Sequence, residues 1–229
     1  MGTVVLDKVY ANSSSLYSDI VSDVSELWDW ADISTVTGGT MFKINAEDNF
    51  GLLVYNGNAN YTTIAVRFDS ANHHTAGPSS TAGKLLLKAE RVGENTLILS
   101  VWRVSDTSNT IKANLCDKYI ICRAVNTITE EEETVLIFLG SSSTTGSNKC
   151  MLLASDVIQL TDIAAQNANA NVDAKNTNII PFFSPASVYI TKDVYQSLCS
   201  NVSSWYFGDV ILNDKPYRMS GSVFVLDER

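Results

Sequence analysis

Charged side chains are scarce in this sequence of 229 residues. Asp, Glu, Lys and Arg make up 18% of the chain, against about 25% in ordinary globular domains, while hydrophobic residues make up 45%. The 25 acidic residues outnumber the 16 basic ones, which gives a formal net charge of -9. Because binding along a phosphate backbone requires clustered Lys and Arg to displace counterions, nucleic acid is not expected as a partner.

Long apolar runs are also missing. No run approaches the ~20 residues that a helix needs to span a bilayer. The first residues, MGTVVLDKVYANSSS, lack the basic segment followed by an apolar segment that marks a secretory signal. We therefore expect a protein that is made in the cytoplasm, is not secreted through a signal peptide and does not insert into a membrane.

The residues that most often carry catalysis are few. Imidazole occurs only at His73 and His74, so any mechanism with a histidine base depends on this pair. The loop GSSSTTGSNK lacks the Gly-Lys-Ser/Thr ending of a phosphate-binding loop, and no Gly-x-Ser-x-Gly nucleophile motif occurs. Neither an enzyme nor a metal ion or other cofactor is expected, and a cell-wall-degrading activity through the two histidines ranks last among the alternatives.

The cysteines and the run of four glutamates also lack the spacing of a metal site. If LCDKYIIC is a strand, Cys116 and Cys122 share a face but lie about 20 Å apart at ~3.3 Å per residue. That distance is too long for a disulfide, so we expect isolated buried thiols. The glutamates at 130–133 lack the spacing of a calcium-binding loop, and they predict a solvated turn before the strand TVLIFLG.

Ser, Thr and Asn replace the missing charges, and these short polar side chains suit strands and turns. KLLLKAERV and NTLILSVWRV, separated by Gly93 and Glu94, predict a hairpin. KYIICRAV and TVLIFLG, apolar on both faces, predict central strands. YTTIAVRFD alternates with the period of a half-buried strand.

The C-terminal segment predicts another hairpin. Asn213 and Asp214 are typical of a turn with positive φ, and Pro216 predicts a strand at a sheet edge or a first pairing position. The fold class that follows is mainly β: an antiparallel β-sandwich or jelly-roll-like body with one N-terminal amphipathic helix and a C-terminal hairpin. The polar tract 166–178 divides the chain into a strand-rich body, 1–165, and a linker with the C-terminal hairpin, 166–229, which can belong to the same domain.

One helix is predicted, over about residues 14–31. Its apolar stripe consists of Leu16, Ile20, Val24, Leu27 and Ala31. The outer face is acidic, because no basic residue occurs between Lys8 and Lys43. Its members are Asp19, Asp23, Glu26, Asp29 and Asp32. We expect this face to be either solvated or, as an assembly surface through Asp19, Glu26, Asp29 and Asp32, in contact with a basic surface of another subunit.

Aromatic residues offer a second candidate binding surface. Trp205, Tyr206 and Phe207 are consecutive, and with Trp102 they could form a platform on which a sugar stacks. The simpler interpretation is that Trp102 belongs to the core and that the other three pack the C-terminal hairpin.

The segment SSSLYSDIVSDVSELWDW, the Ser/Thr/Asn-rich strand body and the ending WYFGDVILNDKPYRMSGSVFVLDE together resemble small structural proteins encoded beside tail and fibre genes in tailed phages and prophages of Gram-positive bacteria. The resemblance spans the chain and carries over no functional residue. It implies a virion component, assembled in the host cytoplasm, whose partners are itself and other virion proteins. We rank a tail- or baseplate-associated subunit for assembly or host attachment first, a module that binds a host cell-surface glycan second and a capsid decoration protein third.

Overall fold

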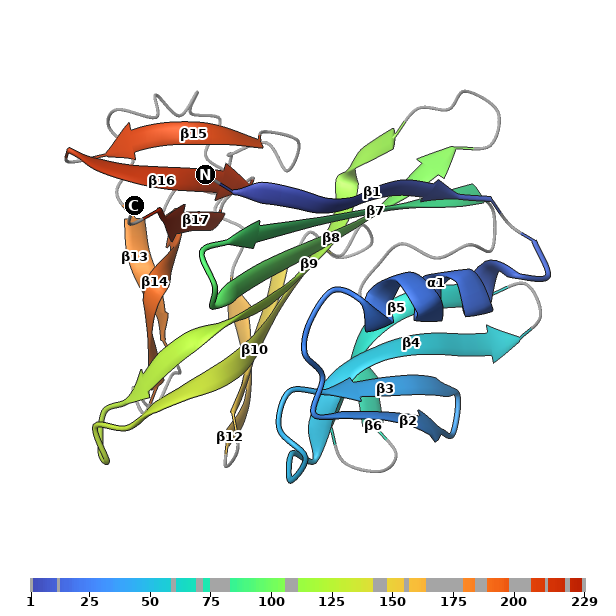
Figure 1. Cartoon of the computed structure of the whole chain (residues 1–229), viewed down its shortest axis with the longest axis horizontal. Coiled ribbons are helices and arrows are strands. Elements are labelled where there is room, and N and C mark those ends of the chain that lie inside the picture. Colours follow the sequence, from blue (N-terminus) through green and yellow to red (C-terminus); the bar gives the residue numbers. More distant parts are fainter. Residues whose placement is uncertain are drawn as a thin grey trace.

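A computed structural model gives the fold of the chain (Figure 1). It describes residues 2–11, 13–58, 61–68, 72–74, 83–105, 111–141, 148–154, 157–163, 179–183, 189–197, 207–212, 214–220 and 223–227. These residues form two antiparallel sheets and one short helix, which confirms the predicted mainly β fold with a sandwich-like body. No helix in these ranges is long and apolar enough to cross a membrane.

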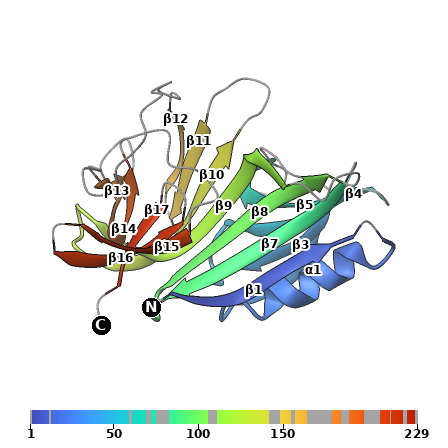
Figure 2. The same cartoon turned by 90° about the horizontal axis from the view of Figure 1, so that it is seen from above.

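The larger sheet has 12 strands and curls into a half-barrel (Figures 1 and 2). Its main path runs through β1 (Thr3–Tyr10), β7 (Gly83–Val92), β8 (Thr96–Ser105), β9 (Ile111–Asn126), β14 (Tyr189–Ser197), β17 (Val223–Leu226), β16 (Lys215–Ser220) and β15 (Phe207–Leu212). Beside this path lie β10 (Glu132–Ser141), β11 (Asn148–Ala154), β12 (Val157–Ile163) and β13 (Ile179–Phe183). The long strand β9 joins the two halves, because it pairs with β8 and then with β14.

The smaller sheet has five strands in sequence order. They are β2 (Asp32–Val36), β3 (Gly39–Lys43), β4 (Phe50–Asn58), β5 (Tyr61–Phe68) and β6 (Asn72–His74). The helix α1 (Leu16–Ser25) lies between β1 and β4 (Figure 1). The small sheet and α1 pack against one face of strands β1, β7, β8, β9 and β10 of the large sheet.

Both faces of the central strands are buried. On the face toward α1, Ile20 of the helix and Phe42 of the small sheet pack in one cluster with Leu99 of β8. On the opposite face, Ile98 and Ile120 pack in a second cluster with strands β14 and β17. Strands buried on both sides need apolar residues at consecutive positions, which confirms the interpretation of KYIICRAV and TVLIFLG as central strands.

The helix is shorter than the sequence predicts. Leu16, Ile20 and Val24 are buried as expected, but the helix ends at Ser25 rather than near residue 31. The amide of Ala31 donates to the carbonyl of Lys43 at 2.9 Å, so the chain has already joined the small sheet at that point. Leu27 fits the 3.6-residue spacing of the apolar stripe because its side chain is also buried. It lies beyond the end of the helix, so the spacing predicted a helix that was too long.

Two further strand predictions have different outcomes. The hairpin of β7 and β8 is confirmed, and Gly93 adopts a φ of 63° in its turn, a value that suits glycine. Strand β5 is not half-buried, because Thr63 and Ala65 are as buried as Ile64. Its outer face has a small cluster of its own, in which Ala65 packs with residues of β3 and β4.

The C-terminal hairpin is present at the end of the large sheet. Strands β15 and β16 pair across a turn in which Asp214 has a φ of 62°, as predicted for that residue. Strand β16 is not an edge strand, since it also pairs with β17. Pro216 has no amide hydrogen to donate to a neighbouring strand. This costs no hydrogen bond to β17, because the pairing with β17 begins at Tyr217, one residue later. The expected boundary at 166–178 lies outside the described residues.

Candidate functional site

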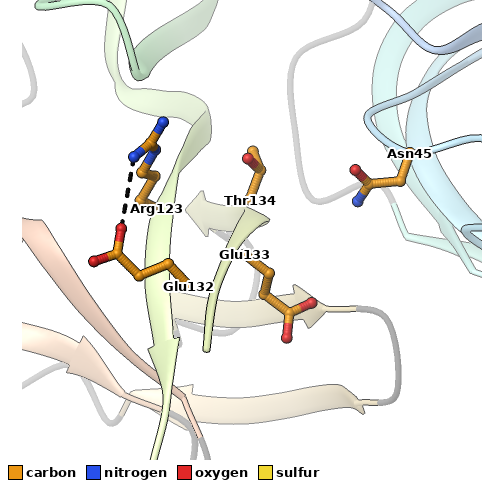
Figure 3. A pocket seen from close by; sticks show the side chains of 5 residues that line it. All are labelled: Asn45, Arg123, Glu132, Glu133 and Thr134. Carbon is orange, nitrogen blue, oxygen red and sulfur yellow. Dashed lines mark ion pairs between the residues drawn. The ribbon is translucent and has the colours of Figure 1, made fainter. Parts of the chain in front are cut away.

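A polar pocket of about 400 Å³ lies at the junction of the two sheets (Figure 3). It is lined by Asn45, Arg123, Glu132, Glu133 and Thr134. Asn45 follows β3 of the small sheet, whereas the other four residues belong to β9 and β10 of the large sheet. We call this the inter-sheet pocket, because any ligand in it would contact both sheets.

The hairpin of β9 and β10 positions the side of the pocket on the large sheet. The Asn126 side-chain oxygen accepts hydrogen bonds from the amides of Ile128 and Thr129, at 2.9 and 3.3 Å, and so holds the turn. The resulting register places Thr134 directly opposite Arg123. Directly opposed residues share a face of the sheet, so both side chains lie on the same side.

Glu132 is the centre of an ion-pair network at this edge. Its carboxylate lies 2.5 Å from the Lys192 amine and 3.6 Å from the Arg123 guanidinium, the second of which is drawn in Figure 3. The hydrogen bond and charge of Lys192, together with Arg123, hold the pKa of Glu132 below its usual value. Of the predicted solvated turn, only Glu130 and Glu131 precede the strand, because Glu132 and Glu133 begin β10. Glu132 has two cationic partners, one of them 60 residues away.

Asp48 supports the side of the pocket on the small sheet. One carboxylate oxygen accepts hydrogen bonds from the main-chain amide of Asn45 at 3.0 Å and from its side-chain amide at 3.2 Å. Burial raises the pKa of Asp48, and the charge of Glu133 raises it further against these hydrogen bonds. Asp48 thus fixes the orientation of a pocket side chain at the cost of being buried beside another acid.

The lining residues offer both donors and acceptors of hydrogen bonds. They combine amide and guanidinium donors with carboxylate and hydroxyl acceptors, a set that fits the hydroxyl groups of a polar ligand. The pocket is therefore a candidate site for a small hydrophilic molecule.

A second polar group is buried on the face of the large sheet away from α1. The Lys118 amine lies 3.2 Å from the Ser100 hydroxyl and 5.7 Å from the centre of the Trp102 ring. Burial lowers the pKa of Lys118, and burial raises the pKa of the neighbouring Cys116 thiol to about 12. A thiol with such a pKa stays protonated at neutral pH and is a poor nucleophile.

The cysteine prediction is confirmed where the structure describes the side chains. Cys116 and Cys122 are both buried thiols. Among the described residues no group of three His, Cys, Asp or Glu side chains is arranged to hold a metal ion. His73 and His74 occupy consecutive positions of β6, opposite Arg67 and Val66 of β5.

The predicted acidic face is not one surface of one helix. Asp19 and Glu26 are exposed on α1 and at its end, but Asp29 lies in the following connection and Asp32 is the first residue of β2. The prediction failed here because it extended the helix past Ser25. These four acids therefore do not form the single helical surface that was expected.

The acidic face also has a cationic partner that the local sequence does not supply. The Lys8 amine of β1 lies 2.6 Å from the Asp23 carboxylate, which also accepts a hydrogen bond from the Tyr10 hydroxyl. Burial raises the pKa of Asp23, but the hydrogen bonds from Lys8 and Tyr10 outweigh it and leave the pKa lowered. The expectation of an acidic face without a neutralising cation is thus wrong at Asp23.

The aromatic candidates are only partly described. Trp102 is buried, as the simpler interpretation predicted, so it is no part of an exposed platform. Trp205 and Tyr206 lie outside the described residues, as does the side chain of Phe207 at the start of β15.

The inter-sheet pocket was not predicted from the sequence. Its residues occur in three separate segments, and no motif connects them. The hairpin could have indicated part of the pocket. KYIICRAV and TVLIFLG pair across a short turn, so Arg123 and the glutamates 130–133 had to lie near one another. Asn45 and Lys192 had no such signal. Comparisons with protein-family models, curated proteins and solved structures find no match to this chain.

Proposed function

We propose that the protein is a non-enzymatic structural subunit of a larger assembly, a tail- or baseplate-associated component of a phage virion. The virion assignment rests on the sequence resemblance alone. The subunit assignment is supported by one observation, the exposed outer edge of β1. Localisation to the virion and association with other virion proteins follow from the same proposal.

Strand β1 has the properties of a pairing edge. It ends the large sheet, and among the described strands it pairs only with β7. Val4 is 43% exposed and Val9 is 52% exposed. An edge strand is usually protected by an outward-pointing lysine or a bulge. Strand β1 has a bulge near Val5, and the charge of Lys8 is paired with the Asp23 carboxylate at 2.6 Å.

The opposite end of the same sheet is also an edge. Strand β15 pairs only with β16 among the described strands, and its Ile211 is 71% exposed. Two different edges on one subunit permit head-to-tail contacts, which produce a ring where the rotation closes and a filament where it does not. Both products are compatible with a role in a tail or baseplate.

The test is the oligomeric state of the purified protein, measured by size-exclusion chromatography with light scattering. We expect concentration-dependent oligomers that dissociate in Val9→Lys, because a lysine there places a charge beside the β1 edge. Ile128→Lys is the matched control, since Ile128 is 77% exposed but lies in the β9–β10 turn. A strict monomer at high protein concentration contradicts the proposal, and so does equal dissociation of both variants.

The second candidate function is recognition of a host surface glycan. The observation that favours it is the inter-sheet pocket, whose size falls within the ~300–1,000 Å³ range of small-molecule sites and whose lining can bond to sugar hydroxyls. Glycan-array binding that is lost in Asn45→Ala and kept in Trp205→Ala supports the pocket. The reverse pattern supports the aromatic platform instead, and binding that neither variant reduces contradicts both.

A further inference from the structure

The last three strands are joined to the rest of the large sheet by a short ladder. We call β15, β16 and β17 the C-terminal unit. Its only strand pairing to the described body is between β17 and β14, through Val194 and Val225, Tyr195 and Phe224, and Gln196 and Val223. The β7–β8 ladder, by comparison, runs from Gly83 to Val92 without interruption. The unit is therefore a peripheral part of the sheet.

The unit also has a hydrophobic cluster of its own. Leu212, Tyr217, Met219 and Phe224 pack together, whereas Val223 and Val225 of β17 pack with Val194 of β14 in the second large cluster. Tyr195 of β14 joins this cluster from the body, with its ring edge-on to Tyr217 at 5.7 Å. A group of strands with internal pairing and internal packing can move as one piece, because its own interactions survive the movement.

One ion pair connects the unit to the far side of the curled sheet. An Arg218 Nη lies 2.6 Å from a carboxylate oxygen of Glu90, which is only 1% exposed. The contact joins β16 to β7, and the ends of β16 and β1 approach each other (Figure 1). Among the described residues, the second Glu90 oxygen and Arg218 Nε have no hydrogen-bond partner.

Such a contact fixes position more than it adds stability. Removing two charges from water costs free energy, which is offset only where their remaining lone pairs and protons also form hydrogen bonds. Here the second Glu90 oxygen and Arg218 Nε form none among the described residues. The C-terminal unit is therefore held in register by Glu90 while its attachment depends mainly on the short β14–β17 ladder and the packing beneath it.

We propose that the C-terminal unit is exchanged between copies of this chain, so that β17 of one copy pairs with β14 of another. A second copy of the chain can take this place beside β14. Its β17 presents the same three residues to β14, and its Arg218 can form the same ion pair with Glu90. Exchange of an identical element costs little, since the interactions that open within each chain form again between the two chains. Residues 198–206 separate β14 from β15 in the sequence, a length that spans up to about 30 Å when extended.

This exchange rests on the proposed function, since it is one way for the subunit to assemble. It differs from simple edge pairing, because β1 and the outer edge of β15 take no part in it. The two proposals therefore fail separately. Edge pairing depends on the surface of β1, whereas exchange depends on the opening of the β14–β17 ladder.

The test uses two preparations, each with one cysteine, in a background where the four native cysteines are replaced by alanine. One carries Val194→Cys and the other Val225→Cys, two residues that face each other across the ladder. After mixing, incubation at high concentration and mild oxidation, we expect a disulfide between the two preparations. Within one copy this bond cannot form, because each copy has a single cysteine. A mixture of Ile98→Cys and Ile120→Cys, paired across β8 and β9, is the control and should give none.

Three results decide the matter. Oligomers by light scattering without the Val194–Val225 cross-link overturn the exchange and leave the proposed function standing. Equal cross-linking in both mixtures also overturns it, because random collision then explains the bond. The third measurement needs no substitution: hydrogen exchange of the unmodified protein should be on the order of tenfold faster in β16 and β17 than in β8 and β9. Equal exchange rates overturn the opening step.

Discussion

The Arg91 guanidinium donates a 2.6 Å hydrogen bond to the main-chain carbonyl of Leu27 and lies 5.6 Å from the centre of the Trp28 ring. The Trp30 indole donates a second bond, of 2.9 Å, to the carbonyl of Val24. The Leu27 carbonyl lies two residues beyond the end of α1, where a cation is favoured by the helix dipole. Strand β7 thus supplies the basic group that the last turn of α1 lacks.

Replacement of Arg91 should therefore destabilise the fold. Arg91→Met keeps much of the side-chain length but removes the donor to Leu27 and the charge over Trp28. We expect a loss of about 1.5–3 kcal/mol, the range for a hydrogen bond with a charged partner, measured by urea unfolding. Arg91→Lys is the control and should recover part of the loss. An unchanged unfolding midpoint in Arg91→Met would show that the contact is not made in solution.

The pairing of Asp23 with Lys8 and Tyr10 should make stability depend on pH. The pKa of Asp23 is lowered on folding, so the stabilisation is complete above the unfolded value of about 3.9 and is lost as pH falls through the lower folded pKa. Asp23→Asn should be less stable than the wild type at pH 7, by under about 1 kcal/mol for such an exposed pair. The difference should shrink below pH 4 in paired denaturation curves. A difference that is constant with pH would contradict the ion pair.

Local signals in the sequence predicted much of the fold. Gly93 and Asp214 both adopt the positive φ that their turns require, and each separates two strands that pair as expected. Hairpins are set by neighbouring residues, so a single sequence contains enough information to identify them. The buried positions of α1 followed in the same way from their spacing.

Contacts between distant segments were not predictable in this way. Arg91 is 64 residues from Leu27, and Lys192 is 60 residues from Glu132. The end of α1 and the charge balance of the inter-sheet pocket both depend on such pairs. Strand β5 illustrates the same limit, because the alternation of YTTIAVRFD predicts one buried face, whereas Ala65 packs in a second cluster on the other side. Burial of polar positions such as Thr63 depends on tertiary packing and leaves no periodic signal.

Gly39 is expected to be irreplaceable for a steric reason. A Cβ atom at this position would lie 2.0 Å from the carbonyl oxygen of Val54, across the β3–β4 ladder. Because the clash involves main-chain atoms, Gly39→Ala should cost at least about 1–3 kcal/mol, the range for overpacking, by thermal or chemical unfolding. Gly93→Asn is the matched control: a Cβ atom at Gly93 would meet no atom within 4 Å, and asparagine tolerates a positive φ. Equal losses in both variants would argue against the clash.

Asp48 should show the opposite pH dependence from Asp23. Burial and the neighbouring Glu133 raise the pKa of Asp48, so the folded chain holds its proton more tightly than the unfolded chain. The stability associated with the protonated acid is then present below the unfolded pKa of about 3.9 and is lost as pH rises through the raised folded pKa. Asp48→Asn keeps an oxygen that can accept from Asn45 and removes the buried charge.

Asp48→Asn should therefore be at least as stable as the wild type at pH 7, and this advantage should disappear as pH falls below about 4. Glu133→Gln should move the Asp48 pKa toward its ordinary value, because it removes the like charge from the pocket. Carboxyl-carbon NMR titration of Asp48 in the wild type and in Glu133→Gln measures that shift directly. Thr134→Val, which changes a neighbouring uncharged pocket residue, is the control and should leave the titration in place. An Asp48 titration that Glu133→Gln leaves unchanged would show that the two acids do not interact across the pocket.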